Sequence, residues 1–301
     1  MPVATQLEDL YAAIEESAQL ARVACSREKV WPVLDAFGDG LADAHVVFSL
    51  ATGERYAEEL AFDFTVPPDA GDPYAVAVSN GLVEKTDHPV GTLFPEIQRR
   101  CPVDSFGVDY GIVGGFKKAY VSFPLGEPQR LSTLAGIPSM PRGLAEHADS
   151  FAAYGLDGKV SAVAIDYAHR TWNVYFSGLS AEQLEPEAVL SMLRANGLPE
   201  PSGRMMDFIQ TTFAMYPTFG WDSSKAERLS FSARSTDPAA LPARYEPLIA
   251  EFAANVPYTY TGERVLVYAG ALSAGEECYK IAAYHQKTAQ LSDRVRPPTP
   301  K

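Results

Sequence analysis

The sequence has no run approaching about 18 apolar residues, the length that a membrane-spanning helix requires. Its first residues, MPVATQLEDLYAAIEES, are acidic and amphipathic and lack the basic and apolar regions of a secretory signal. The three cysteines, Cys25, Cys101 and Cys278, are far apart and show no CxxC or zinc-type spacing. We therefore expect a soluble cytoplasmic protein that works in a reducing compartment and has no contact with membranes.

Familiar catalytic motifs are also missing. The chain contains no DDxxD, HExxH, Walker, GxSxG or GxGxxG motif, and its five histidines show no metal-ligand spacing. The net charge of -13 argues against nucleic acid or an anionic membrane as a partner. In so acidic a chain, any group of Lys and Arg side chains on one interior face needs a reason.

The chain of 301 residues alternates between helical and strand patterns. Apolar residues at helical spacing predict helices around 7–18, 27–41 (with Ser26 as the cap), 144–154, 186–196 and 245–255, and one opened by Asp72-Pro73. Alternating patterns predict strands at 44–50, 59–66, 106–113, 116–123, 160–167, 171–176, 208–216, 228–234, 264–272 and 278–286.

The predicted strands form five pairs that are separated by helices. Five antiparallel pairs of this kind can close into one ten-stranded barrel with helices outside, a fold of the α+β class. Two separate α+β domains are the alternative, because periodicity cannot show closure. We expect a single domain over residues 1–287 and a flexible, Pro-rich tail over 288–301.

The stretch GGFKKAYVSF, residues 114–123, shows what such a barrel would enclose. Its apolar residues alternate with Lys118, Tyr120 and Ser122, and Asp and Glu are scarce on the polar faces of the second strand of each pair. In a closed barrel those faces would meet in a lumen that holds Lys118, Tyr120, Asn173, Tyr175, Tyr216, Arg228, Lys280 and Tyr284. Cations and phenols together suit a small anion with an apolar part. The alternative is that these are the solvated faces of an open sheet.

Four stretches, together with flanks such as GDPYAVAVSNGL and LAGIPSMP, carry a resemblance to a known family. The stretches are GGFKKAYVSF, AIDYAHRTWNVYFS (164–177), MYPTFGWDSSKAERLSF (215–231) and CYKIAAYHQ (278–286). In this order and over nearly the whole chain, they resemble the soluble ABBA aromatic prenyltransferases, the CloQ/NphB group. The resemblance implies five αββα units that close a ten-stranded barrel around a solvated lumen, in a cytoplasmic monomer.

The reaction that the resemblance implies is transfer of a prenyl group, dimethylallyl or geranyl, from an allylic diphosphate to an electron-rich aromatic ring in secondary metabolism. By position, Tyr120 and Tyr175 flank the prenyl cation and act with Lys118 as the catalytic residues. The implied diphosphate-binding residues are Lys118, His169, Asn173, Tyr216, Lys225, Arg228 and Lys280. The implied acceptor pocket consists of Val47, Ser161, Ala162, Phe213, Ala214, Ser232, Val267, Ala282 and Tyr284.

The chain departs from the family at two positions. Ala61 stands where magnesium-dependent relatives carry an Asp, and His169 stands where a diphosphate-contacting Lys is common. We therefore expect no metal and no other cofactor, with Asp63 as the one possible substitute ligand for Mg²⁺. The functional alternative is a non-catalytic protein that binds an aromatic or anionic small molecule in the same cavity. A metal-dependent hydrolase is a weaker third possibility, because the ligand sets that it needs are missing.

Overall fold

The computed structural model describes residues 3–53 and 59–287. Ten antiparallel strands form a closed barrel, in the order β1-β10-β9-β8-β7-β6-β5-β4-β3-β2. The strands are β1 (Val46–Ala51), β2 (Ala61–Val66), β3 (Ser105–Gly111), β4 (Gly115–Ser122), β5 (Val160–Asp166), β6 (Thr171–Ser177), β7 (Ala214–Gly220), β8 (Ala226–Ser235), β9 (Leu266–Ser273) and β10 (Glu277–Gln286). Closure confirms the predicted ten-stranded barrel, and the reading as an open sheet is wrong. The predicted flexibility of the tail from residue 288 lies outside the described residues.

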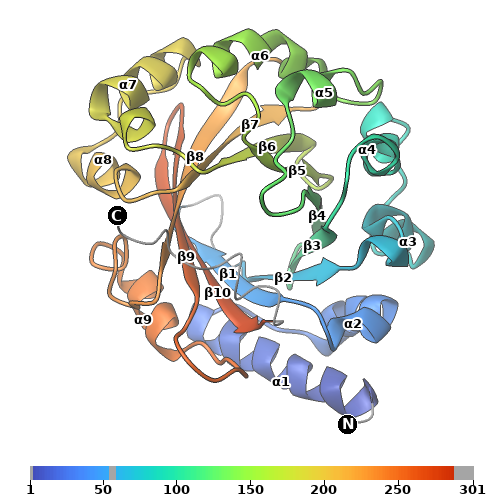
Figure 1. The fold of residues 1–301 in the computed structure, drawn as a ribbon. Helices are drawn as coiled ribbons and strands as arrows, with labels where there is room; N and C mark the ends of the chain where they lie inside the picture. The colour runs from blue at the N-terminus through green and yellow to red at the C-terminus, as the bar shows by residue number, and fades with distance from the viewer. Residues whose placement is uncertain (1–2, 54–58, 288–301) are drawn as a thin grey trace.

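Helices run around the outside of this barrel in chain order, with α1 and α2 beside the first strands and α9 beside the last (Figure 1). Their bounds are α1 (Val3–Ala21), α2 (Arg27–Leu41), α3 (Pro73–Ser79), α4 (Leu93–Arg100), α5 (Leu131–Ala135), α6 (Arg142–Ala153), α7 (Pro186–Ala195), α8 (Gly203–Ile209) and α9 (Pro247–Asn255). Among the described residues, no helix is long and apolar enough to cross a membrane.

The hydrophobic core lies between the helices and the outer face of the barrel. Alternation along each strand sends one set of side chains outward, and Phe62, Trp172 and Phe231 are fully buried there. Each large apolar side chain buried in this way contributes roughly 1.5–3 kcal/mol. The same alternation points the intervening residues into the lumen, so the core fixes which side chains the lumen receives.

Local signals set most helix boundaries. The Asp72 side chain accepts a hydrogen bond from the Tyr74 backbone N–H and caps α3, with Pro73 at its first position. Helix α7 is followed by Gly197, whose φ of 67° is the left-handed conformation that glycine favours at helix ends. Ser26 occupies the predicted N-cap position of α2, but its hydroxyl makes no capping hydrogen bond.

One predicted element is wrong. The strand expected at 208–216 is split, because Phe208 belongs to α8 and β7 begins only at Ala214. Ser202 caps α8 by accepting a hydrogen bond from the Met205 N–H. The helix lies close against β9 because Gly270 has no Cβ; a Cβ there would come within 2.6 Å of the Met205 sulfur. Tertiary packing on this glycine therefore outweighs the strand-like pattern around Phe208.

Candidate active site

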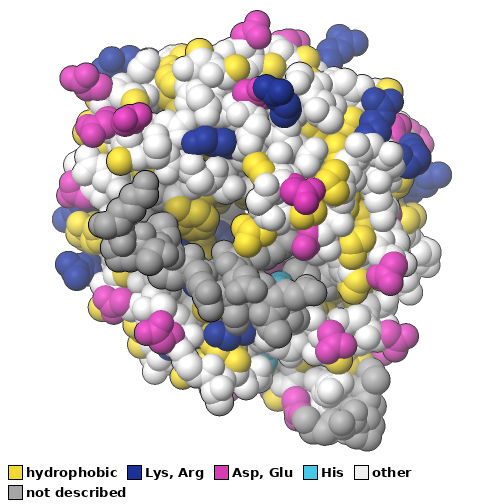
Figure 2. Space-filling model, in the orientation of Figure 1, with side chains coloured by type: hydrophobic (Ala, Val, Ile, Leu, Met, Phe, Trp, Pro, Cys, Tyr) yellow, Lys and Arg dark blue, Asp and Glu magenta, His cyan; other side chains and the backbone are white. Residues whose placement is uncertain are grey.

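The lumen holds a cavity of about 480 Å³ lined by residues of all ten strands and of the loops that join them. On the face of the molecule in Figure 2, hydrophobic side chains border a hollow near the centre, and charged side chains are scattered around it. The lining includes the predicted residues Lys118, Tyr120, His169, Tyr175, Tyr216, Arg228 and Lys280. The structure thus brings into one cavity the cations and phenols that the alternating patterns placed on separate strands.

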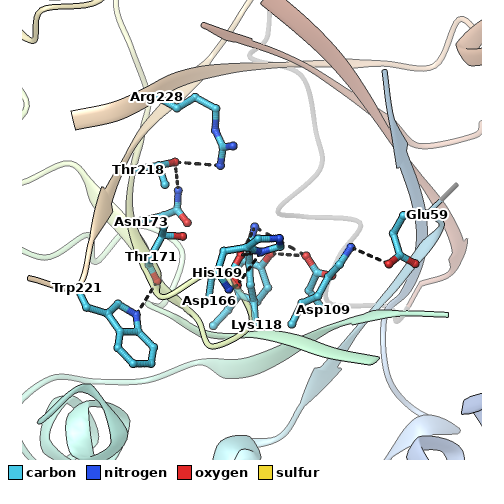
Figure 3. A network of polar contacts seen from close by, with 12 residues as sticks. Glu59, Asp109, Lys118, Asp166, His169, Thr171, Asn173, Thr218, Trp221 and Arg228 are labelled. Carbon is cyan, nitrogen blue, oxygen red and sulfur yellow. Dashed lines mark hydrogen bonds and ion pairs between the residues drawn. The ribbon is translucent and has the colours of Figure 1, made fainter. Parts of the chain in front are cut away.

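Lys118 lies between two carboxylates. Its ammonium nitrogen is 3.8 Å from Asp166 Oδ2 and 4.0 Å from Asp109 Oδ2 (Figure 3). Lys118 pairs across the sheet with Asp109 of β3 on one side and with Asp166 of β5 on the other, so the strand register itself creates this arrangement.

His169 is held by the same aspartate. Its Nδ1 lies 3.1 Å from both carboxylate oxygens of Asp166, and its backbone N–H donates to Oδ1 at 2.8 Å. Burial raises the pKa of Asp166, but the hydrogen bond from His169 and the charge of Lys118 outweigh burial and lower it. Asp166 is therefore an ionised carboxylate that fixes two potential cations at one end of the cavity.

Arg228 reaches the cavity from the opposite wall. Its Nη2 donates to Thr218 Oγ1 at 3.2 Å, and the Asn173 amide donates to the same oxygen at 2.6 Å (Figure 3). Asn173 is fully buried beside this hydroxyl. The three residues sit on adjacent strands β6, β7 and β8, so they form a hydrogen-bonded row across the wall.

Three phenols form the middle of the lumen wall. The Tyr175 and Tyr216 rings stack with centroids 4.5 Å apart, and Tyr120 lies 6.1 Å from Tyr175. Burial raises the pKa of both Tyr120 and Tyr175 well above that of an exposed phenol. Tyr120 and Tyr175 therefore stay protonated, and they present aromatic faces and O–H donors without negative charge.

Carboxylates contribute more to the lumen than the polar faces of the second strands predict. Glu59, Asp109 and Asp166 line the cavity, and Asp63 is half-buried beside Ser49, whose hydroxyl donates to it at 3.1 Å. Burial and the charge of Asp109 raise the pKa of Asp63 to about 6. The expectation of few carboxylates concerns only the second strand of each pair. The same alternation on the first strands would have found Asp109 and Asp166.

Lys117 was not predicted, and it also lines the cavity. A register shift in the β3–β4 pair places Asp109 opposite Lys118 and Tyr110 opposite Phe116. Two consecutive lysines can then face inward, and the Lys117 ammonium lies 3.8 Å from Glu59 Oε2. Strict alternation would put Lys117 on the outer face, so only the irregularity beside Gly115 (φ 82°) reveals it.

Two groups of predicted residues lie away from the cavity lining. Lys225 is exposed in the turn between β7 and β8, and the Phe213 side chain, just before β7, is 41% exposed. The strand pairing places the lumen-facing members of the predicted acceptor pocket beyond the phenols, toward the end of the barrel opposite the basic residues. These members are Val47, Ala162, Ala214, Ser232, Val267, Ala282 and Tyr284. Ser161 lies at a register shift, and its hydroxyl donates to the Tyr175 carbonyl.

This arrangement can do two things chemically. Its basic end can bind an anion through charge-assisted hydrogen bonds, and its aromatic middle can stabilise a cation in a site shielded from water. Within residues 3–53 and 59–287, no group of three or more His, Cys, Asp or Glu side chains could hold a metal ion. Binding of a small anion at the basic end and of a carbocation between the phenols are both compatible with this cavity.

Comparison with known proteins agrees with this reading. The family model for the aromatic prenyltransferase Orf2 matches residues 5–294. The chain belongs to this aromatic prenyltransferase family. The resemblance to the CloQ/NphB group is confirmed, and allylic diphosphates and aromatic compounds are the substrates that membership implies.

Relatives from Streptomyces cover almost the whole chain. A flaviolin linalyltransferase of Streptomyces virginiae is 47% identical over 93% of this chain and 92% of its own length. A furaquinocin biosynthesis prenyltransferase of Streptomyces sp. (strain KO-3988) is 45% identical over 94% and 92%. A 5,10-dihydrophenazine-1-carboxylate 9-dimethylallyltransferase of Streptomyces anulatus is 43% identical over 95% of both chains. The chain is thus an aromatic prenyltransferase of secondary metabolism.

Proposed function

We propose that this prenyltransferase moves a dimethylallyl or geranyl group from its diphosphate to a fused-ring, phenolic acceptor of the polyketide type. The observation that carries the proposal is the stacked pair Tyr175–Tyr216. Along the strands, this pair lies between the basic end of the lumen and small residues such as Ala214 and Ser232. The names of two Streptomyces relatives, a flaviolin linalyltransferase and a 5,10-dihydrophenazine-1-carboxylate 9-dimethylallyltransferase, support an aromatic acceptor of this kind.

In the proposed reaction the basic residues hold the diphosphate while the allylic C–O bond breaks and its electron pair leaves with the phosphate oxygen. In this proposal Lys118, Arg228 and Lys280 supply positive charge, and Tyr216 and His169, which also line the cavity, donate hydrogen bonds. Asn173 would act by holding Thr218, the hydroxyl that also accepts from Arg228. Groups fixed around developing negative charge lower the barrier without reorganising. Because Lys225 is exposed, we assign it a minor, long-range part.

The prenyl cation would then lie between the faces of Tyr120 and Tyr175, whose rings are 6.1 Å apart. A cation over an aromatic face gains about 0.5–2 kcal/mol per ring when water is excluded. The acceptor ring supplies the electron pair for the new C–C bond, and its displaced proton passes to water or to the departing diphosphate. The reaction therefore demands no dedicated histidine or carboxylate base.

We also propose that this transfer requires no Mg²⁺. Ala61 lines the cavity where a carboxylate would be needed, and a methyl group cannot ligate a hard cation. Asp63, the one possible substitute ligand, accepts a hydrogen bond from Ser49 and lies beside Asp109. We further propose a cytoplasmic monomer with no nucleic-acid or membrane partner; light scattering of the purified protein would test the monomer.

The test is an acceptor panel with each short donor. Purified protein is incubated with dimethylallyl or geranyl diphosphate and a set of dihydroxynaphthalenes, naphthoquinones and phenazines, and products are analysed by chromatography and mass spectrometry. The proposal requires a product heavier by one prenyl group, and formation of that product should fall strongly in Lys118→Ala. Binding of both substrates with no product from any pair would favour the non-catalytic carrier instead.

A further inference from the structure

Arg234 is a cation on the lumen face that the diphosphate site does not account for. On β8, Arg228, Ser230, Ser232 and Arg234 alternate without a register shift in their pairing with β9, so their side chains share one face. Arg228 and Ser230 line the cavity, which shows that this face points into the lumen.

The position of Arg234 separates it from the donor site. Three two-residue steps along β8 place its Cα roughly 20 Å from that of Arg228. A diphosphate held by Arg228 cannot reach so far, so Arg234 serves another purpose. Within the described part of the chain, its guanidinium has no carboxylate partner and makes no side-chain hydrogen bond.

The surroundings of Arg234 are those expected around an aromatic ligand. It pairs across the ladder with Val267, which pairs in turn with Ala282. Tyr284 packs against Val265 in a small apolar cluster that is separate from the outer core. Burial lowers the pKa of Arg234, and the nearby Tyr284 phenol opposes that effect. A partly buried guanidinium beside a phenol and a small apolar surface is suited to a planar anion.

We propose that Arg234 is a specificity-determining residue that binds an anionic substituent, a carboxylate or an acidic enol, on the aromatic acceptor. The inference rests on the proposed function, because it assumes that this end of the lumen receives the acceptor. The acceptor class then becomes an acidic hydroxyarene whose charged group faces Arg234 and whose reacting carbon faces the phenols.

The experiment compares two acceptors that differ by one carboxylate: a dihydroxynaphthalene and the dihydroxynaphthoic acid with the same hydroxyl pattern. Binding of each is measured by calorimetry in the presence of a non-cleavable thiolo-diphosphate analogue of the donor, and kcat/KM is measured with the donor itself. For the wild-type protein we expect the acid to bind about tenfold or more tightly than the neutral compound, as one charged hydrogen-bonded contact permits.

Arg234→Met should remove this preference. We expect the Kd of the acid to rise about tenfold or more, while the Kd of the neutral acceptor changes less than about threefold. Arg234→Lys keeps the charge and should retain part of the preference. The matched control is Arg99→Met on the exposed face of α4, which makes the same charge change outside the barrel and should leave both acceptors unaffected.

Equal effects of Arg234→Met on both acceptors, or no preference for the acid in the wild type, would overturn the proposal. The proposed function can fail separately. If the acid binds in an Arg234-dependent way but no acceptor is ever prenylated, the anion site stands and the transfer reaction does not. If acceptors are prenylated but binding of the acid does not depend on Arg234, the transfer reaction stands and the anion site does not.

Discussion

Lys118 and Asp166 face each other across β4 and β5, with the ammonium nitrogen 3.8 Å from a carboxylate oxygen. The same carboxylate holds the His169 ring, so one aspartate orients two groups that are proposed to meet the diphosphate. An ion pair at this distance keeps the lysine side chain extended into the lumen before any ligand binds. Asp109, on the other side of Lys118, completes this support at 4.0 Å.

Loss of Arg228 should weaken donor binding. A hydrogen bond to a charged group contributes about 1.5–3 kcal/mol, so Arg228→Ala should raise the Kd of a non-cleavable donor analogue by about 10- to 100-fold. Calorimetry measures this directly, and Arg99→Ala on the exposed face of α4 is the control. Donor affinity that is unchanged in Arg228→Ala would remove this residue from the diphosphate site.

Larger side chains at the small acceptor-side positions should select against large acceptors. Ala214 pairs with Ser232, and Ala282 pairs with Ser49 and Val267, so both project from the lumen face. Ala214→Phe or Ala282→Leu should lower kcat/KM for bicyclic and tricyclic phenols by about tenfold more than for monocyclic ones, because overpacking costs about 1–3 kcal/mol. Ala12→Leu on the exposed face of α1 is the control. Equal losses for all acceptor sizes would contradict this placement.

The fold could be predicted from the sequence because apolar and polar residues alternate along each strand. A strand covered by helices on one face must alternate, so Phe62, Phe64 and Val66 identify the outer face of β2 without any knowledge of its neighbours. The same patterns predict five strand pairs separated by helices. The choice of a closed barrel over two separate domains rests on the resemblance, because the period of one strand does not show which strands pair.

The parts that could not be predicted depend on contacts between distant elements. Phe208 reads as strand but lies in α8, since that helix packs on Gly270 more than sixty residues later. The inward turn of Lys117 depends on a register shift between β3 and β4. The ion pairs of Lys118 join residues on three strands, and no spacing along the chain encodes them.

Asp63 should make stability depend on pH in the opposite sense to Asp166, whose pKa is lowered in the folded protein. Burial and the charge of Asp109 raise its pKa from 3.8 to about 6. The folded protein therefore favours the protonated form, so this contribution to stability is complete below about pH 4 and is lost as pH rises through about 6. The loss is on the order of 3 kcal/mol.

Asp63→Asn removes the titration and keeps an acceptor for Ser49. At each pH, the free energy of unfolding of the mutant is compared with that of the wild type. The mutant-minus-wild-type difference should be larger at pH 7.5 than at pH 4, by on the order of 3 kcal/mol. Urea unfolding with EDTA at both pH values measures the difference, with the exposed Asp35→Asn in α2 as control. A difference between mutant and wild type that is the same at both pH values would show that Asp63 does not titrate in this range.

Prenyl transfer should continue when divalent cations are removed. A diphosphate carries about three negative charges at neutral pH, and fixed cations or a metal must offset them before the allylic bond can break. Ala61 offers only a methyl group, and the Cα of Asp63 lies about 6.5–7 Å further along β2. The Asp63 carboxylate also accepts a hydrogen bond from Ser49, which holds it away from a shifted metal. The charge therefore falls to Lys118, Arg228 and Lys280.

The measurement is turnover with excess EDTA against turnover with millimolar Mg²⁺, for the wild type and for Ala61→Asp. The wild type should keep most of its rate in EDTA, because none of its charge compensation depends on a metal. Ala61→Asp adds a carboxylate next to the diphosphate, so its rate should fall in EDTA and recover with Mg²⁺. If the wild type itself loses most of its activity on chelation and regains it with Mg²⁺, Asp63 becomes the substitute ligand. Asp63→Asn should then abolish the recovery.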